Sequence, residues 1–345
     1  MKTMKKFTAA LLSSVLCTSL AGCGSSASSA TAAASAAASE TPAASAAADT
    51  AGRTYTIGIV QLVQHVALDA ATQGFQDEVK KELGEDAVTF DVQNAAGDSA
   101  TCTTIANQFV TEGVDLILAN ATPALQAAAA ATNTIPILGT SVTEYGTALG
   151  ISDFSGTVGG NISGTSDLAP LDQQAAMFDE LLPDAQKIGI LYCSAEANSV
   201  YQADVVQKAL EDAGKTVTIY TFTDSNDVAS VTRSACSEND ALYIPTDNTA
   251  ASCAESINNV ASESSTPIIA GEEGIMSGCG IASLSIDYYE LGVTTGKMAV
   301  RILKGEDDIS TMPIEYYANP VKKYMPERCE AYGISVPDDY TAYEG

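Results

Sequence analysis

The stretch Ile57–Val60 reads Ile-Gly-Ile-Val, and Ile188–Leu191, 131 residues later, reads Ile-Gly-Ile-Leu. Two more matches follow in the same chain order, at shifts of 125 and 131 residues: Asp115–Leu118 with Asp240–Tyr243, and Ile135–Ile137 with Thr266–Ile268. Generic strand composition produces one such match easily, but hardly three in order at nearly one offset. The sequence therefore predicts two lobes of common design.

Short β-branched strands alternate with amphipathic helices from Thr54 onward, which is typical of a parallel sheet with helices on both faces. The first helix should follow a strand over 55–60, since its apolar residues fall three or four apart. Further strands are expected over 88–92, 116–119 and 137–139, with helices near 100–110 and 124–131. The predicted fold class is α/β, with two Rossmann-like lobes built on parallel sheets.

The chain after residue 280 offers two elements that the second lobe does not need, a strand over 281–286 and a helix over 288–303. We expect both to complete the first lobe, and the tail over 315–343 to return to the second. Three hinge crossings are then predicted near Gly164, Ser283 and Pro313, with the glycine-rich stretch before Gly164 as a connection. The predicted lobes are 54–164 plus 284–312, and 165–283 plus 313–345.

The N-terminus has the order of a bacterial export signal over residues 1–23, with three lysines, an apolar stretch over 7–20 and then small residues. It ends in Leu-Ala-Gly-Cys, which resembles a lipoprotein processing site with Cys23 as the lipid anchor. Residues 24–52 are almost wholly alanine and serine, too poor in large apolar side chains to fold, so we expect a tether. The protein is thus predicted to be extracytoplasmic and bound to the cell membrane through this lipid alone.

The chain is strongly acidic, with 43 acidic and 16 basic residues and a formal net charge of −27, which becomes −30 when the three signal lysines are removed. Such a charge repels nucleic acid and anionic lipid, so neither is an expected partner. An exported chain can form disulfides, but the irregular spacing of the six remaining cysteines favours mostly free, buried thiols and leaves one bridge open. These cysteines are Cys102, Cys193, Cys236, Cys253, Cys279 and Cys329.

Ligands of open parallel sheets bind beyond the carboxyl ends of the strands, where loops and helix N-termini present polar groups. With two lobes face to face, these loops line one cleft. In the first lobe the residues expected there are Gln64, His65, Thr122, Thr140 and Ser141.

The second lobe contributes acids and amides to the same cleft. The residues expected there are Asn198, Ser199, Asp247, Asn248 and Glu272. Hydroxyls and a helix N-terminus on one side and carboxylates on the other suit a zwitterion, with its ammonium held by Asp247 or Glu272, so the favoured ligand is an amino acid. Helix capping is the competing role for each acid.

The sequence carries no signature of covalent chemistry. Phosphate-binding, zinc-protease and dinucleotide-binding motifs are absent, and no residue is marked as an activated nucleophile with a base and an orienting group. We therefore expect no catalytic residue, no cofactor and no metal. A surface enzyme was the alternative from another class, and it would need such a matched set.

Six blocks of sequence resemble the substrate-binding proteins of ABC transporters of the tryptophan/tyrosine type. They lie in order over residues 54–310, at Gln61–Asp69, Ala121–Gln126, Gly164–Asp167, Glu196–Ser199, Pro245–Asn248 and Ile286–Gly292. The blocks add Ser166 and Asp287 to the expected ligand-binding residues. One departure is the loop over 271–274, Gly-Glu-Glu-Gly, which is more acidic than the family pattern.

The resemblance implies the type I periplasmic-binding-protein fold, a monomeric receptor that closes on an aromatic amino acid, and delivery to a permease and its ATPase. The exact ligand stays open at this point. A nucleoside or a sugar in the same fold, or a sensor without transport, is the alternative function. A nucleoside receptor would favour stacked aromatic side chains in both lobes, whereas the expected cleft is rich in hydroxyls and acids.

Overall fold

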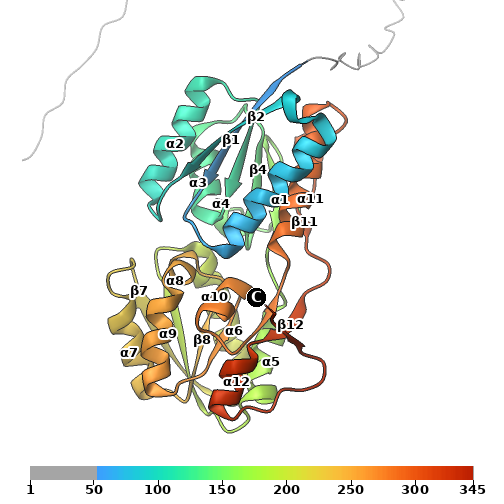
Figure 1. Cartoon of the computed structure of the whole chain (residues 1–345). Coiled ribbons are helices and arrows are strands. Elements are labelled where there is room, and N and C mark those ends of the chain that lie inside the picture. Colours follow the sequence, from blue (N-terminus) through green and yellow to red (C-terminus); the bar gives the residue numbers. More distant parts are fainter. Residues whose placement is uncertain (1–52, 345) are drawn as a thin grey trace, which may run out of the picture. The chain divides into compact units, whose positions relative to one another are not determined.

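A computed structural model describes residues 53–344. These residues form two sheets with helices on both faces (Figure 1), and we call each sheet with its helices a lobe. The export signal, the Ala/Ser-rich tether and Cys23 lie outside the described residues. Over residues 53–344, no helix combines the length and the apolar character that crossing a membrane requires.

The first lobe contains a six-stranded sheet in which every neighbouring pair of strands is parallel. Its strands, in spatial order, are β2 (Val88–Asn94), β1 (Tyr55–Gln61), β3 (Leu116–Asn120), β4 (Ile137–Val142), β5 (Ile162–Ser166) and β11 (Glu315–Tyr316). Its helices are α1 (Val66–Leu83), α2 (Ser99–Glu112), α3 (Thr122–Ala131), α4 (Tyr145–Leu149) and α11 (Tyr288–Leu303), with short 3-10 turns at Glu85–Ala87 and Ile309–Thr311.

The second lobe contains a seven-stranded sheet, parallel except where β12 pairs with β10. Its strands, in spatial order, are β7 (Thr216–Phe222), β6 (Lys187–Cys193), β8 (Ala241–Ile244), β9 (Ile268–Ala270), β10 (Ala282–Ser285), β12 (Val321–Tyr324) and β13 (Thr341–Ala342). Its helices are α5 (Leu171–Leu181), α6 (Ala197–Asp212), α7 (Val228–Glu238), α8 (Asn248–Ser252), α9 (Ala254–Ser264), α10 (Glu273–Cys279) and α12 (Pro326–Tyr332).

The two sheets repeat one strand order, since β2-β1-β3-β4-β5 of the first corresponds to β7-β6-β8-β9-β10 of the second. The matching sequences lie at equivalent places, and the aspartate before the third strand of each lobe accepts the same kind of hydrogen bond. Asp115 accepts a hydrogen bond from the backbone N–H of Thr56 at 2.8 Å, and Asp240 accepts one from Lys187 at 2.8 Å. Both carboxylates thus tie the start of the third strand to the start of the first, and the α/β prediction is confirmed.

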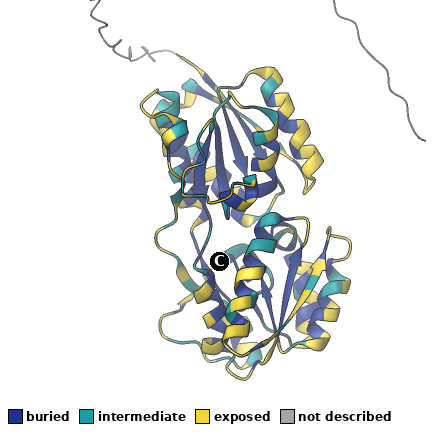
Figure 2. Cartoon of the chain, turned by 180° about the vertical axis from the view of Figure 1, so that it is seen from behind, coloured by how far each residue is buried: buried dark blue, intermediate teal, exposed yellow. Residues whose placement is uncertain are grey.

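Apolar cores lie on both faces of each sheet, and the central strands are the most deeply buried elements (Figure 2). In the first lobe α2 and α3 cover one face, while α1 and α11 lie side by side on the other. Glycines permit this close helix pair, because a Cβ at Gly74 would overlap the backbone of Tyr289, and one at Gly292 would overlap the backbone of Ala71. The apolar face of α11 therefore completes the first lobe from a segment more than 200 residues away from α1 in the sequence.

Two expectations about the connections were wrong. The stretch around Gly164 is the strand β5 rather than a linker, and β10 pairs with β9 and β12 in the second sheet rather than completing the first. The tail also enters the first sheet before it reaches the second, since β11 pairs with β5. The chain crosses between sheets after β5, β10 and β11. The division into lobes that move separately stays a prediction.

Candidate ligand-binding cleft

The helices that begin at the carboxyl ends of the strands contact each other across the two lobes. Helix α1 meets α10, and both α3 and α4 meet α6. One hydrogen bond also joins the lobes, between His65 Nε2 at the end of the β1–α1 loop and Asn248 Oδ1 at the start of α8, at 3.3 Å. The loops that follow the strands therefore face one another, as the strand-end rule predicts.

Five buried polar atoms in these facing loops have no hydrogen-bond partner: His65 Nδ1, Thr122 Oγ1, Ser141 Oγ, Asp167 Oδ1 and Asn198 Oδ1. Buried polar atoms are almost always paired, and leaving one unpaired costs about 1–3 kcal/mol. Four of them come from the first lobe and one from the second. Orphaned donors and acceptors on loops that face one another are what a polar ligand would satisfy.

The hydroxyls of the first lobe stand where the backbone is unusual. Ser141 has a φ of +53° near the end of β4, and Ala121, just before Thr122, has a φ of +93°. Such conformations are uncommon for residues other than glycine and occur often at ligand sites. Thr122 begins the ten-residue helix α3, whose N-terminal N–H groups add a partial positive charge. The part of the cleft at the start of α3 is therefore suited to receive negative charge.

The carboxylate of Asp167 follows β5 directly and is buried. Its Oδ2 accepts a hydrogen bond from the Tyr288 hydroxyl at 3.0 Å, and its Oδ1 is unpaired. Burial raises the pKa of this carboxyl from 3.8 to about 6. Asp167 was not among the expected site residues, although it stands next to Ser166 in the sequence.

The acids expected in the second lobe are instead engaged with backbone. Asp247 caps α8 by accepting from the N–H of Ala250 at 2.7 Å, and it also accepts from the N–H of Cys193 at 2.7 Å. Glu272 caps α10 through the N–H groups of Gly274 and Ile275. Burial raises the pKa of each carboxyl to about 7.

A network of amides and one carboxylate surrounds the start of α8. Glu196 accepts from the side chain of Asn248 at 2.6 Å and from the backbone N–H of Thr249 at 2.9 Å. Asn198 donates to the backbone oxygen of Thr246 at 2.9 Å, and to Ser199 at 3.2 Å. These bonds fix the second-lobe loops and leave the Asn198 oxygen free.

The structure places the other expected residues in supporting or outer positions. Thr140 accepts from Thr165 at 3.2 Å within a buried cluster of hydroxyls, and Ser166 donates to the backbone oxygen of Thr143 at 2.8 Å. Gln64 is exposed, and Asp287 is an exposed N-cap of α11. These last two side chains are not brought together with the orphaned atoms.

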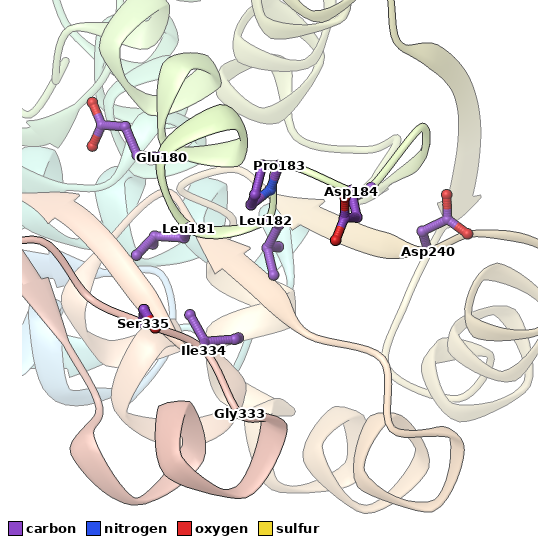
Figure 3. A pocket seen from close by; sticks show the side chains of 10 residues that line it. Glu180, Leu181, Leu182, Pro183, Asp184, Asp240, Gly333, Ile334 and Ser335 are labelled. Carbon is purple, nitrogen blue, oxygen red and sulfur yellow. The ribbon is translucent and has the colours of Figure 1, made fainter.

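Several cavities lie on the described residues, and two of them differ clearly in their position. One of about 180 Å³ lies between loops of both lobes, with Asp98 and Pro123 on one side and Glu196 and Thr249 on the other. Another, of about 590 Å³, lies far from these loops, at the amino ends of the second sheet, where Glu180 and Asp240 are among its lining residues (Figure 3).

Two acidic side chains that line the larger cavity already have partners within the protein. Glu180 is bound by Lys322 at 2.8 Å and by the Tyr340 hydroxyl at 2.6 Å, and Asp240 is bound by backbone N–H groups. The unpaired polar atoms therefore favour the facing loops as the functional site. No group of three or more histidine, cysteine or acidic side chains within residues 53–344 is arranged to hold a metal ion. The six cysteines of this range are free, and five of them are buried.

A family profile described as "ABC transporter substrate binding protein" matches residues 56–321. The tyrosine-binding protein of Clostridioides difficile (strain R20291) is 38% identical over 260 residues, which are 75% of this chain and 75% of that protein.

Solved protein structures are also similar to this chain. The ABC domain from Streptococcus pneumoniae in complex with L-Trp is 33% identical, with a TM-score of 0.79 over 83% of this chain and 96% of that one. The ligand-free, open structure of a substrate-binding protein with adhesive properties from Clostridium difficile is 35% identical, with a TM-score of 0.64 over 84% of this chain and 99% of that one.

Proposed function

We propose, from the premise that this chain belongs to the family of ABC transporter substrate-binding proteins, that its cleft binds an amino acid with an aromatic side chain. As a member of the family, the protein is the extracytoplasmic substrate-binding component of an ABC importer, with a type I periplasmic-binding-protein fold. The names of the similar proteins, tyrosine-binding and bound to L-Trp, support the aromatic class of ligand. The cluster of five orphaned polar atoms is the observation that carries the proposal.

The ligand ammonium binds Asp167. This carboxylate is buried, none of the ion pairs within residues 53–344 includes it, and one of its oxygens is unpaired. A buried carboxylate without a cation is costly, and a ligand ammonium supplies the missing charge. Asp247 and Glu272 already accept backbone hydrogen bonds, so we assign them to holding their loops.

The ligand carboxylate binds the hydroxyls of Thr122 and Ser141 and the N-terminus of α3. Two unpaired hydroxyls and a helix N-terminus match an anion in both hydrogen bonding and charge. Asn198 contributes a contact from the second lobe through its unpaired Oδ1. The remaining expected residues, Thr140, Ser166, Ser199 and Asn248, position these groups through the bonds described above.

The two lobes close on the ligand. Supporting this, the TM-score is higher with the L-Trp-bound structure than with the ligand-free, open one, although the sequence identities are similar. Ligand contacts from both lobes exist together only when the lobes meet, so binding shifts the equilibrium toward the closed form. The permease and its ATPase then receive the ligand from this form, and the protein itself makes and breaks no covalent bond.

The N-terminal residues hold the receptor at the membrane. The signal is cleaved before Cys23, which carries the lipid as the first residue that remains, and residues 24–52 form the tether. A lipid-anchored monomer needs no partner other than the permease complex to act. The two proposed cleft faces belong to one chain, which supports a monomeric receptor.

A thermal-shift screen of the purified protein tests the function. Amino acids, nucleosides and simple sugars are added separately, because a ligand at a hundredfold its dissociation constant adds about 2.7 kcal/mol to the free energy of unfolding. We expect a clear rise of the melting temperature with tyrosine, tryptophan or phenylalanine. A rise with a nucleoside or a sugar alone would leave the family intact and reject the amino acid ligand.

A further inference from the structure

We infer that His65 selects ligands whose side chain carries a hydrogen-bond donor at its far end, by accepting that hydrogen on Nδ1. This inference rests on the proposed function and deepens it, because it separates tyrosine and tryptophan from phenylalanine. Three features of the described residues carry it: the orientation of Asn248, the unpaired Nδ1 and the position of His65 beyond the end of β1.

The orientation of Asn248 fixes which nitrogen of His65 holds the proton. The amide nitrogen of Asn248 donates to Glu196 at 2.6 Å, so its Oδ1 faces His65 Nε2 at 3.3 Å. An amide oxygen only accepts hydrogen bonds, and therefore Nε2 must be the donor. Glu196 cannot turn away freely, because it also accepts from the backbone N–H groups of Asn248 and Thr249.

A neutral imidazole has one donor and one acceptor, so Nδ1 is left as an acceptor. Burial lowers the pKa of His65 from its usual 6.5, which keeps the ring neutral at physiological pH. Nδ1 is buried and has no partner within the protein. A ligand that offers a hydrogen there gains a bond, and one that offers a C–H leaves the acceptor unpaired.

The position of His65, which is the N-cap of α1 beyond the end of β1, decides which ligand group reaches it. His65 follows β1 and Asp167 follows β5, and β3 and β4 lie between these two strands. Three strand spacings place the ends of β1 and β5 about 14 Å apart. An ammonium held by Asp167 therefore cannot reach His65 as well, whereas the end of a long side chain directed across the sheet can. The phenol O–H of tyrosine and the indole N–H of tryptophan are the donors of this kind.

The test measures dissociation constants by calorimetry on the untagged, ligand-free protein. We expect phenylalanine to bind about 10- to 100-fold more weakly than tyrosine, since the unpaired acceptor remains buried. A second comparison, of tryptophan with 1-methyltryptophan, tests the indole N–H as the donor, because the methyl group replaces its hydrogen. The variant His65→Phe keeps an aromatic ring and removes the acceptor. In this variant the dissociation constants of phenylalanine and tyrosine should agree within about twofold, and so should those of 1-methyltryptophan and tryptophan.

A measurement on the unaltered chain keeps the inference testable if His65→Phe does not fold. His65 is the one histidine in the sequence, so its ring nitrogens give unambiguous ¹⁵N signals. We expect the Nε2–H tautomer, with an Nδ1 signal that moves when tyrosine or tryptophan is added and stays with phenylalanine.

The outcomes separate the two proposals. Equal binding of tyrosine and phenylalanine, or an Nδ1–H tautomer in the bound protein, overturns the role of His65 and leaves the receptor function standing. Absence of binding by every aromatic amino acid overturns the proposed function and this inference with it.

Discussion

Replacing Asp167 by asparagine removes one buried negative charge and changes almost no volume. Both the hydrogen bond from Tyr288 and the burial of the side chain can be retained, since an amide oxygen also accepts. What is lost is the attraction to a cation. The variant therefore isolates the charge that we assign to the ligand ammonium.

The pKa of Asp167 gives the size of the effect. Burial raises this pKa from 3.8 to about 6, which means that the ionised carboxylate is destabilised by about 3 kcal/mol in the ligand-free protein. An ammonium placed against Oδ1 offsets that penalty. An asparagine carries no charge and has no such penalty, so the ammonium gains nothing from it. We expect Asp167→Asn to raise the dissociation constant for an aromatic amino acid about 100-fold.

Calorimetric titration of the wild type and two variants checks this value. Asp172→Asn is the matched control, because it removes the same charge from an exposed position on α5 and should leave affinity unchanged. A second ligand, 3-(4-hydroxyphenyl)propionate, lacks only the ammonium of tyrosine and should bind Asp167→Asn no more weakly than wild type, because it cannot compensate the charge of Asp167. Unaltered tyrosine affinity in Asp167→Asn, or an equal loss for the ligand without the ammonium, would refute the assignment.

Four more predictions follow, three from the structure and one from the N-terminal sequence. Tyrosine affinity should fall as the pH drops below about 6, because the ionised form of Asp167 binds the ammonium, and titrations from pH 8 to 5 test this. The free energy of unfolding of the ligand-free protein should instead rise as the pH falls from 7 to 5 in denaturant melts. Burial raises the pKa of Asp167, Asp247 and Glu272, so the folded chain binds protons there that the unfolded chain does not, and these three groups outweigh the opposite contribution of His65, whose pKa burial lowers. A free energy of unfolding that stays constant or falls over this pH range contradicts the prediction. Gly292→Ala should lower that free energy by about 2–3 kcal/mol, because its Cβ meets the backbone of α1, and an unchanged melt would show that the helices separate easily. Cys23→Ser should move the protein from the membrane to the soluble fraction, and retained anchoring rejects the lipid.

Much of the fold was predictable, because hydrophobic periodicity is a local signal. Helix α11 has the bounds that the sequence predicts, and its apolar positions, with Asp287 as the cap, explain why. Strand β5 escaped prediction, since Ile-Ser-Gly-Thr-Ser has the composition of a loop. It becomes a strand only through pairing with β4 and with β11, which follows it by about 150 residues. Tertiary context of that kind leaves no trace in a short window of sequence.

The candidate site was predictable as a region but not as a set of contacts. The strand-end rule identified the loops that hold Thr122, Ser141 and Asn198, because it depends only on where strands end. It could not separate Asp247, which caps a helix, from Asp167, which has a free oxygen. That difference depends on which backbone N–H groups approach each carboxylate in three dimensions. A count of acids near strand ends therefore cannot distinguish a carboxylate that caps a helix from one with an unpaired oxygen.

In the proposed closing mechanism, the unpaired atoms disfavour the closed form of the receptor when it is empty. With the lobes in contact, Asp167 and Ser141 on one side and Asn198 on the other are buried without partners. Each costs about 1–3 kcal/mol in that state and nothing once water reaches it. A closed receptor without ligand is thus disfavoured by its own polar groups, whereas a ligand that satisfies them removes the penalty on both lobes at once. Under this proposal selectivity and closure have one physical origin, because a molecule that leaves one of these atoms unpaired is expected to bind more weakly and to close the lobes less completely.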